Sequence, residues 1–143
     1  MNQQCECGPR KKAAEERPGR RLNILMVEDS ENDALLIADA LWRAGLELSW
    51  KRVESAAELR AALAQSAWSV VLSDYRLPGF SALEAFRICQ ESGTNVPFLV
   101  VSGSEGDDQA AAAMKAGIRG WMVKDDLGRL AQVVAELSGG SQM

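Results

Sequence analysis

The sequence contains no histidine and only three cysteines among its 143 residues. Zinc sites are built mainly from these two residue types, and Cys5, Cys7 and Cys89 cannot supply the usual four ligands, so we expect no zinc site. Without histidine the chain cannot itself carry a phosphohistidine. The odd number of cysteines and a polar N-terminus without an apolar stretch argue against secretion, so we expect a cytoplasmic location with reduced cysteines.

Long hydrophobic runs are also absent. The longest apolar segments, LNILMV and PFLVV, are far shorter than the ~18 residues that a membrane-spanning helix needs, so no membrane partner is expected. The net charge is −4, which argues against the broad basic face of a nucleic-acid-binding protein. Hydrophobic residues make up 47% and charged residues 25% of the chain, a balance typical of one globular domain.

The charge is unevenly distributed along the chain. Residues 1–21 are basic, rich in Gly and Pro, and lack apolar periodicity, whereas the remainder is acidic. This composition predicts a disordered basic tail at 1–21, a folded domain at 22–138 and a frayed C-terminal tail at 139–143.

From Leu22 onward, short apolar runs alternate with amphipathic stretches, a pattern that predicts five strand–helix units. Capping boxes begin the second and third helices, and a loop with Pro78 and Gly79 precedes the third. The expected strands are 22–27, 47–53, 69–73, 97–102 and 120–123, and the expected helices are 30–44, 55–65, 81–91, 107–116 and 126–137.

The inner strands of this pattern are apolar throughout, which is typical of strands covered on both faces, whereas the alternating segment 47–53 predicts an edge strand. The fold class is therefore α/β, with a five-stranded parallel sheet between helices on both faces. Right-handed crossovers favour the flavodoxin-like strand order 2-1-3-4-5.

Polar residues stand where the expected strands end. Glu28 and Asp29 follow the first strand, Asp74 follows the third, Ser102 ends the fourth and Lys124 follows the fifth. Each alone has an ordinary explanation as a cap, a turn residue or a solvated side chain. Parallel strands end at one edge of a sheet, however, so the three carboxylates should lie close together and repel one another.

Such a cluster needs either protonation or a cation, and ligands that are all oxygen select a hard divalent ion such as Mg²⁺. A magnesium ion beside a lysine and a hydroxyl can stabilise a phosphoryl group during transfer. In this interpretation Asp74 is the nucleophile that becomes an acyl phosphate, and Glu28 and Asp29 hold the metal. Lys124 balances charge on the phosphoryl oxygens, and Ser102 donates a hydrogen bond to one of them.

Four separated motifs, ILMVEDSENDA, VVLSDYRLPGFSALEA, PFLVVSG and AMKAGIRGWMVKDD, resemble the receiver domains of bacterial two-component response regulators. The resemblance covers residues 22–138. It implies that Asp74 is phosphorylated by a sensor histidine kinase or a phosphotransfer protein. It also implies that Arg76 lends its backbone carbonyl to Mg²⁺, that Ser102 is a switch hydroxyl and that the Trp121 ring turns inward on phosphorylation.

In that family, phosphorylation changes the face formed by the fourth helix, fifth strand and fifth helix. The resemblance thus implies an unidentified downstream protein as partner and allows a homodimer. Only six residues follow Leu137, which favours a stand-alone signalling module rather than an enzyme. Asp125 stands where most members have proline, so no cis peptide is expected and the orientation of Lys124 stays open.

Two other functions remain open at this point. The chain could be a receiver-like adaptor that binds partners without phosphorylation. It could also be a magnesium-dependent phosphohydrolase, although Asp74-Tyr75-Arg76 lacks the second carboxylate of the usual D-x-D motif.

Overall fold

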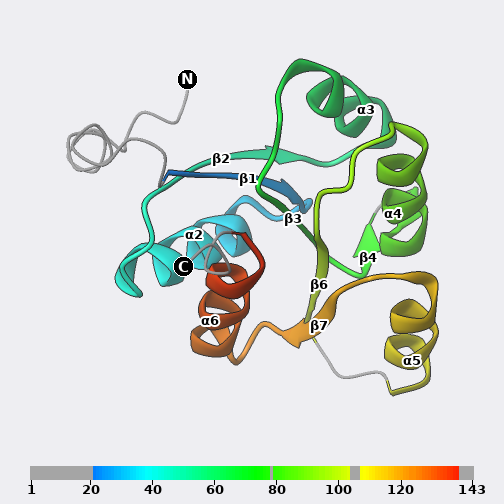
Figure 1. The fold of residues 1–143 in the computed structure, drawn as a ribbon. Coiled ribbons are helices and arrows are strands. Elements are labelled where there is room, and N and C mark those ends of the chain that lie inside the picture. The colour runs from blue at the N-terminus through cyan, green and yellow to red at the C-terminus, as the bar shows by residue number, and fades with distance from the viewer. Residues whose placement is uncertain (1–20, 78, 104–106, 139–143) are drawn as a thin grey trace.

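The computed structural model describes residues 21–77, 79–103 and 107–138, so the tail expected at 139–143 and all but Arg21 of the tail expected at 1–21 lie outside the described residues. The strands are β1 (Leu22–Val27), β2 (Leu48–Val53), β3 (Val70–Ser73), β4 (Arg76–Leu77), β5 (Phe80–Ser81), β6 (Phe98–Ser102) and β7 (Gly120–Val123) (Figure 1). The helices are α2 (Glu31–Arg43), α3 (Ala56–Gln65), α4 (Ala82–Glu91), α5 (Asp107–Ala116) and α6 (Leu127–Ser138).

Five of the strands form one parallel sheet in the order β2-β1-β3-β6-β7. Because β4 and β5 form a separate hairpin, β6 and β7 are the fourth and fifth strands of the sequence prediction. The predicted fold class and the order 2-1-3-4-5 are therefore confirmed. The alternating segment at β2 lies at an edge, as expected.

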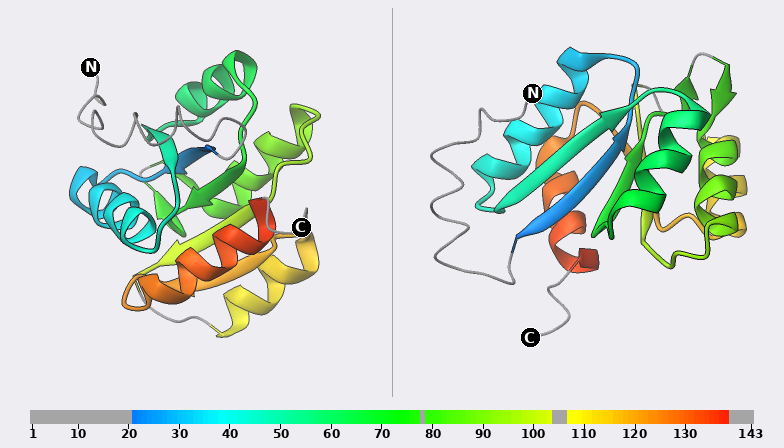
Figure 2. Two further views of the ribbon diagram at one scale, coloured as in Figure 1. Left: turned by 60° about the vertical axis from the view of Figure 1, so that its left-hand side comes forward. Right: turned by 90° about the horizontal axis from the view of Figure 1, so that it is seen from above.

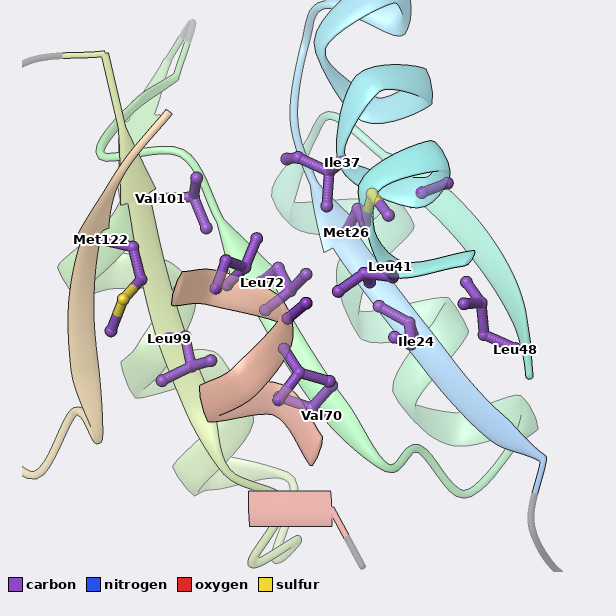
Figure 3. Packing of buried hydrophobic residues seen from close by; sticks show 14 of the residues in the cluster. Ile24, Met26, Ile37, Leu41, Leu48, Val70, Leu72, Leu99, Val101 and Met122 are labelled. Carbon is purple, nitrogen blue, oxygen red and sulfur yellow. The ribbon is translucent and has the colours of Figure 1, made fainter. Parts of the chain in front are cut away.

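Helices cover both faces of this sheet, with α2 and α6 on one face and α3, α4 and α5 on the other (Figures 1 and 2). Successive side chains of a strand point to opposite faces, so β1 feeds two separate cores. Ile24 and Met26 pack against α2 and α6 (Figure 3), whereas Leu25 and Val27 pack toward α3 and α4. All four side chains are fully buried, which explains the uninterrupted apolar run.

Serine caps fix where three helices begin. The Ser30 hydroxyl accepts the Asp33 N–H at 3.2 Å, and Ser81 and Glu84 form the complete capping box that the sequence predicts. The capping box predicted at the start of α3 is only half formed. The Ser55 hydroxyl accepts the Glu58 N–H, but the Glu58 carboxylate accepts the N–H of Glu54 instead of that of Ser55. These caps start each helix close to the carboxyl end of the preceding strand.

The segment after Asp74 is not a plain loop, and the sequence prediction was wrong there. β4 and β5 pair antiparallel, with Arg76 opposite Ser81 and Leu77 opposite Phe80. Leu77 is buried in the core under α3 and α4, and the Ala82 N–H donates to the Tyr75 carbonyl at 3.0 Å. This burial and the closing hydrogen bond stabilise strands that are too short to show periodicity, and they fix the backbone that follows Asp74.

Two glycines provide a test of the helix ends. Gly117 follows α5 with a φ of +114°, and an added Cβ would lie 3.2 Å from Cζ of Phe86, whereas a Cβ at Gly128 in α6 would meet open space. We expect Gly117→Ala to destabilise the domain by about 1–2 kcal/mol because of the left-handed backbone. Gly128→Ala should stabilise it by roughly 0.5–1 kcal/mol through helix propensity. Urea unfolding measures both, and equal midpoints for the two variants would contradict the described helix ends.

Candidate functional site

The carboxyl ends of the parallel strands bring the predicted acidic residues together. One carboxylate oxygen from each of Glu28, Asp29 and Asp74 lies within 4.8 Å of the others. Glu28 is buried, Asp29 is exposed and Asp74 is partly buried. The cluster therefore has an inner wall formed by Glu28 and an open side at Asp29.

The last rungs of the sheet hold these residues in place. The Glu28 N–H donates to the Val53 carbonyl and the Asp74 N–H donates to the Val27 carbonyl, both at 2.9 Å. Further along the same edge, beyond β3, the Lys124 N–H donates to the Ser102 carbonyl at the end of β6, at 2.7 Å. Glu28, Asp74 and Lys124 are thus each attached to a neighbouring strand by the backbone, which restricts how far their side chains can move apart.

Lys124 points into the acidic cluster. Its Nζ lies 3.0 Å from Oε1 of Glu28, 2.5 Å from Oδ2 of Asp33 and 3.7 Å from Oδ2 of Asp74. The described residues contain no cis peptide bond, so the bond between Lys124 and Asp125 is trans, as predicted. The orientation that the sequence left open is therefore achieved without a proline.

Asp33 is the site residue that the sequence analysis missed. It lies in the first turn of α2, 91 residues before Lys124, and it makes the shortest of the lysine's three ion pairs. Acidic residues are common in the first turn of a helix because they complement the helix dipole, so Asp33 alone gives no functional signal. Its position four residues after Asp29, in the first turn of the helix that follows the acidic pair, is the one local hint.

Burial sets the electrostatics of the cluster. Burial raises the pKa of Glu28, and the negative charge of Asp74 raises it further. The hydrogen bond to Lys124 lowers this pKa but only partly offsets the effect of burial. Burial likewise raises the pKa of Asp74, against the lowering effects of Lys124 and of the Tyr75 N–H. For Lys124, burial works to lower the pKa, but the bonds to Asp33 and Glu28 outweigh it and the pKa is raised. The carboxylates therefore remain under-compensated by one ammonium group, which favours a further cation.

The donor set fits Mg²⁺, because it consists of carboxylate oxygens from Glu28, Asp29 and Asp74 on one open-sided cluster. No histidine or cysteine takes part. Exposure at Asp29 leaves room for the water molecules that this ion usually retains.

Aromatic side chains adjoin the cluster. The Tyr75 N–H donates to Oδ1 of Asp74 at 2.8 Å, and the Tyr75 ring contacts the Trp121 ring with centroids 4.9 Å apart. Trp121 is partly buried and packs against the core under α3 and α4. Ser102 is buried at the end of β6, and Arg76 lies in β4, two residues after Asp74. Trp121 lies two residues before the end of β7 and reaches Tyr75 through its ring, whereas the other residues predicted from the sequence lie at the strand ends or in the segments that follow them.

A parallel α/β sheet with an acidic cluster and an inward lysine at its carboxyl edge is the architecture of a receiver-type signalling domain. The chain belongs to the response regulator receiver domain family, whose model matches residues 24–135. Within the described residues, no helix is both long and apolar enough to cross a membrane.

Individual relatives of this chain include bacterial regulatory proteins. The chain is 30% identical over 116 residues to the response regulator protein PilR of Pseudomonas aeruginosa, which covers 80% of this chain and 26% of PilR. It is 31% identical over 107 residues to the hydrogenase transcriptional regulatory protein HoxA of Cupriavidus necator, covering 73% of this chain and 21% of HoxA. The chain thus spans about a quarter or less of the length of these curated relatives.

Solved structures share the fold. A response regulator from Hahella chejuensis has a TM-score of 0.71 at 21% identity, covering 81% of this chain and 94% of that one. Another similar structure is the receiver domain of a sensor histidine kinase from Pseudomonas aeruginosa, solved with a magnesium ion in its active-site cleft. It has a TM-score of 0.68 at 22% identity, and the match covers 82% of this chain and 98% of that one.

The raised pKa of Asp74 predicts a stability effect. A carboxyl group whose pKa is higher in the folded than in the unfolded state lowers the free energy of unfolding as pH rises above its ordinary value. Asp74→Asn removes that penalty and can keep the hydrogen bond from Tyr75. In buffer with EDTA at pH 8 we expect its Tm to exceed that of the wild type by a few degrees, with the difference closing near about pH 4. A lower Tm for Asp74→Asn at pH 8 would contradict this.

Proposed function

We propose that this chain is a phosphorylation-controlled signalling domain in which Asp74 accepts a phosphoryl group from a sensor histidine kinase or phosphotransfer protein. The observation that carries the proposal is the placement of Asp74 between two further carboxylates and the Lys124 ammonium. The reaction depends on Mg²⁺ held by Glu28, Asp29, Asp74 and the backbone carbonyl of Arg76. The magnesium ion in the active-site cleft of the similar receiver domain from Pseudomonas aeruginosa supports the choice of metal.

The two oxygens of Asp74 have different surroundings. Oδ1 accepts the Tyr75 N–H, whereas Oδ2 lies 3.7 Å from Nζ of Lys124, beyond hydrogen-bond distance. Oδ2 is therefore the better nucleophile. It attacks the phosphorus of a phosphohistidine, the new O–P bond forms as the P–N bond breaks, and the electron pair returns to the imidazole nitrogen.

Charge stabilisation follows from the groups around Oδ2. A Mg²⁺ ion held by Glu28, Asp29 and Asp74 would supply positive charge to the phosphoryl oxygens. Lys124 pairs with one phosphoryl oxygen, and the Ser102 hydroxyl donates to another. The Lys124 N–H donates to the Ser102 carbonyl, which keeps these two residues adjacent.

The output of this reaction is a change of partner. The Trp121 ring contacts Tyr75, whose N–H binds Asp74, so a change at the carboxylate reaches β7 through two contacts. We propose that the face of α5, β7 and α6 then binds a downstream protein or a second copy of this chain, in the cytoplasm, without direct contact to nucleic acid or membrane. This function is that of the receiver unit at residues 22–138, alone or joined to an output domain.

The adaptor alternative depended on the missing proline after Lys124. Because Lys124 already points toward Asp74 across a trans peptide, we favour the phosphoacceptor over an adaptor that ignores phosphorylation. We also favour it over a phosphohydrolase, because the described acidic group contains no second carboxylate from the segment after β3. Catalysis is then limited to the domain's own phosphorylation and dephosphorylation.

Intact-mass spectrometry after incubation with acetyl phosphate and Mg²⁺ tests the phosphoacceptor. We expect the added mass of one phosphoryl group in the wild type, and none in Asp74→Asn or in EDTA. Asp39→Asn, which removes a partly exposed acid of α2 that pairs with Arg43 and lies outside the acidic cluster, is the matched control and should be modified like the wild type. An adduct that persists in Asp74→Asn would refute the assignment, and partner binding that Asp74→Asn leaves unchanged would support the adaptor.

Tryptophan fluorescence tests the link to Trp121. Adding beryllofluoride, a phosphoryl mimic, with Mg²⁺ should change the emission of the wild type because the Tyr75 contact is disturbed. The change should largely disappear in Trp121→Phe and persist in Trp50→Phe. A response that Trp121→Phe leaves intact would show that the signal does not pass through this ring pair.

A further inference from the structure

We infer that Asp33 is a positioning residue for the proposed phosphoryl transfer, holding Lys124 off Asp74, the carboxylate that must accept the phosphoryl group. The inference rests on the proposed function and adds a residue to it. The three carboxylates that can share a cation are Glu28, Asp29 and Asp74, and Asp33 does not belong to them. It nonetheless makes the shortest contact with Lys124.

The contact distances show which acid governs the lysine. Nζ lies 2.5 Å from Asp33, 3.0 Å from Glu28 and 3.7 Å from Asp74. The first two are hydrogen-bond distances for a charged pair, and the third is not. Lys124 is therefore held near Asp74 without bonding to it, and Oδ2 of Asp74 keeps its lone pairs for attack.

Asp33 is well placed to act as a fixed anchor. Its N–H donates to the Ser30 hydroxyl, and the Ser30 N–H donates in turn to Oε2 of Glu28 at 3.1 Å. The next residue, Ala34, is fully buried and locks this turn of α2 onto the core. The backbone of Asp33 is thus tied to the metal-binding segment itself, so its carboxylate stays within reach of Lys124.

Removing this anchor should redirect the lysine. An ammonium group that loses its closest carboxylate moves toward the remaining ones, and the step from 3.7 Å to a direct bond with Asp74 is small. There it would occupy an oxygen needed for attack and compete with Mg²⁺ for the cluster. With Asp33 present, a divalent cation can take Glu28 and Asp74 while Lys124 keeps a carboxylate partner.

Magnesium affinity provides the test, measured by NMR titration of backbone amides near Asp74 on the whole chain. We expect Asp33→Asn to raise the Kd for Mg²⁺ by about three- to tenfold, the effect of a competing cation at close range. Asp33→Glu should restore much of the affinity. Lys124→Met should lower the Kd because the competitor is gone.

A double-mutant cycle separates this from a plain loss of negative charge. If Asp33 acts through Lys124, Asp33→Asn should change the Kd little in the Lys124→Met background. Glu31→Gln, which removes an exposed acid from the same turn of α2, should leave the Kd near that of the wild type. If Asp33→Asn does not fold, as its amide spectrum would show, Asp33→Ser takes its place in the cycle.

The outcomes distinguish the inference from the proposed function. A wild type that binds Mg²⁺, with an equal penalty for Asp33→Asn with and without Lys124, would overturn the role of Asp33 and leave the phosphoacceptor intact. An unchanged Kd in Asp33→Asn would do the same. A wild type that binds no Mg²⁺ would overturn the proposed function, and the positioning role with it.

Discussion

One ammonium group shared among three carboxylates is the interaction on which this site depends. Glu28, Asp33 and Asp74 all lie close to Nζ of Lys124, while Asp29 completes the acidic group on the open side. Like charges held this close repel strongly unless a cation lies between them. The lysine neutralises part of this negative charge and leaves the remainder to a divalent cation. In the proposed reaction, the Lys124 ammonium exchanges a carboxylate partner for a phosphoryl oxygen.

The sheet makes this arrangement possible because it fixes the backbone of the site residues while their side chains stay able to move when the charge of the cluster changes. Two fully buried cores, one on each face, hold β1 and β3 in register, and the last hydrogen bonds of the ladder place Glu28 and Asp74 beside each other. Packed interiors of this kind resist deformation, so a charge change at the edge is passed to the surface through specific contacts. The Tyr75 and Trp121 rings form one such contact.

The sequence could predict those features that depend on neighbours along the chain. The uninterrupted apolar run of β1 and the serine caps at Ser30 and Ser81 are local features, so the five strands, the helices and the strand-end position of Asp74 were all predictable. The hairpin of β4 and β5 was not, because its strands have two residues each and depend on burial of Leu77. Nor was the pairing of Asp33 with Lys124, since it joins residues 91 positions apart and depends on how α2 starts.

The most direct test of this account is a crystal structure of the chain with Mg²⁺ and beryllofluoride. The account predicts a metal ion held by Glu28, Asp29 and Asp74, beryllofluoride on Asp74, and Nζ of Lys124 moved from Asp33 to a fluorine atom. A metal ion bound elsewhere, or a Lys124 side chain that stays on Asp33 with the phosphoryl mimic in place, would contradict it.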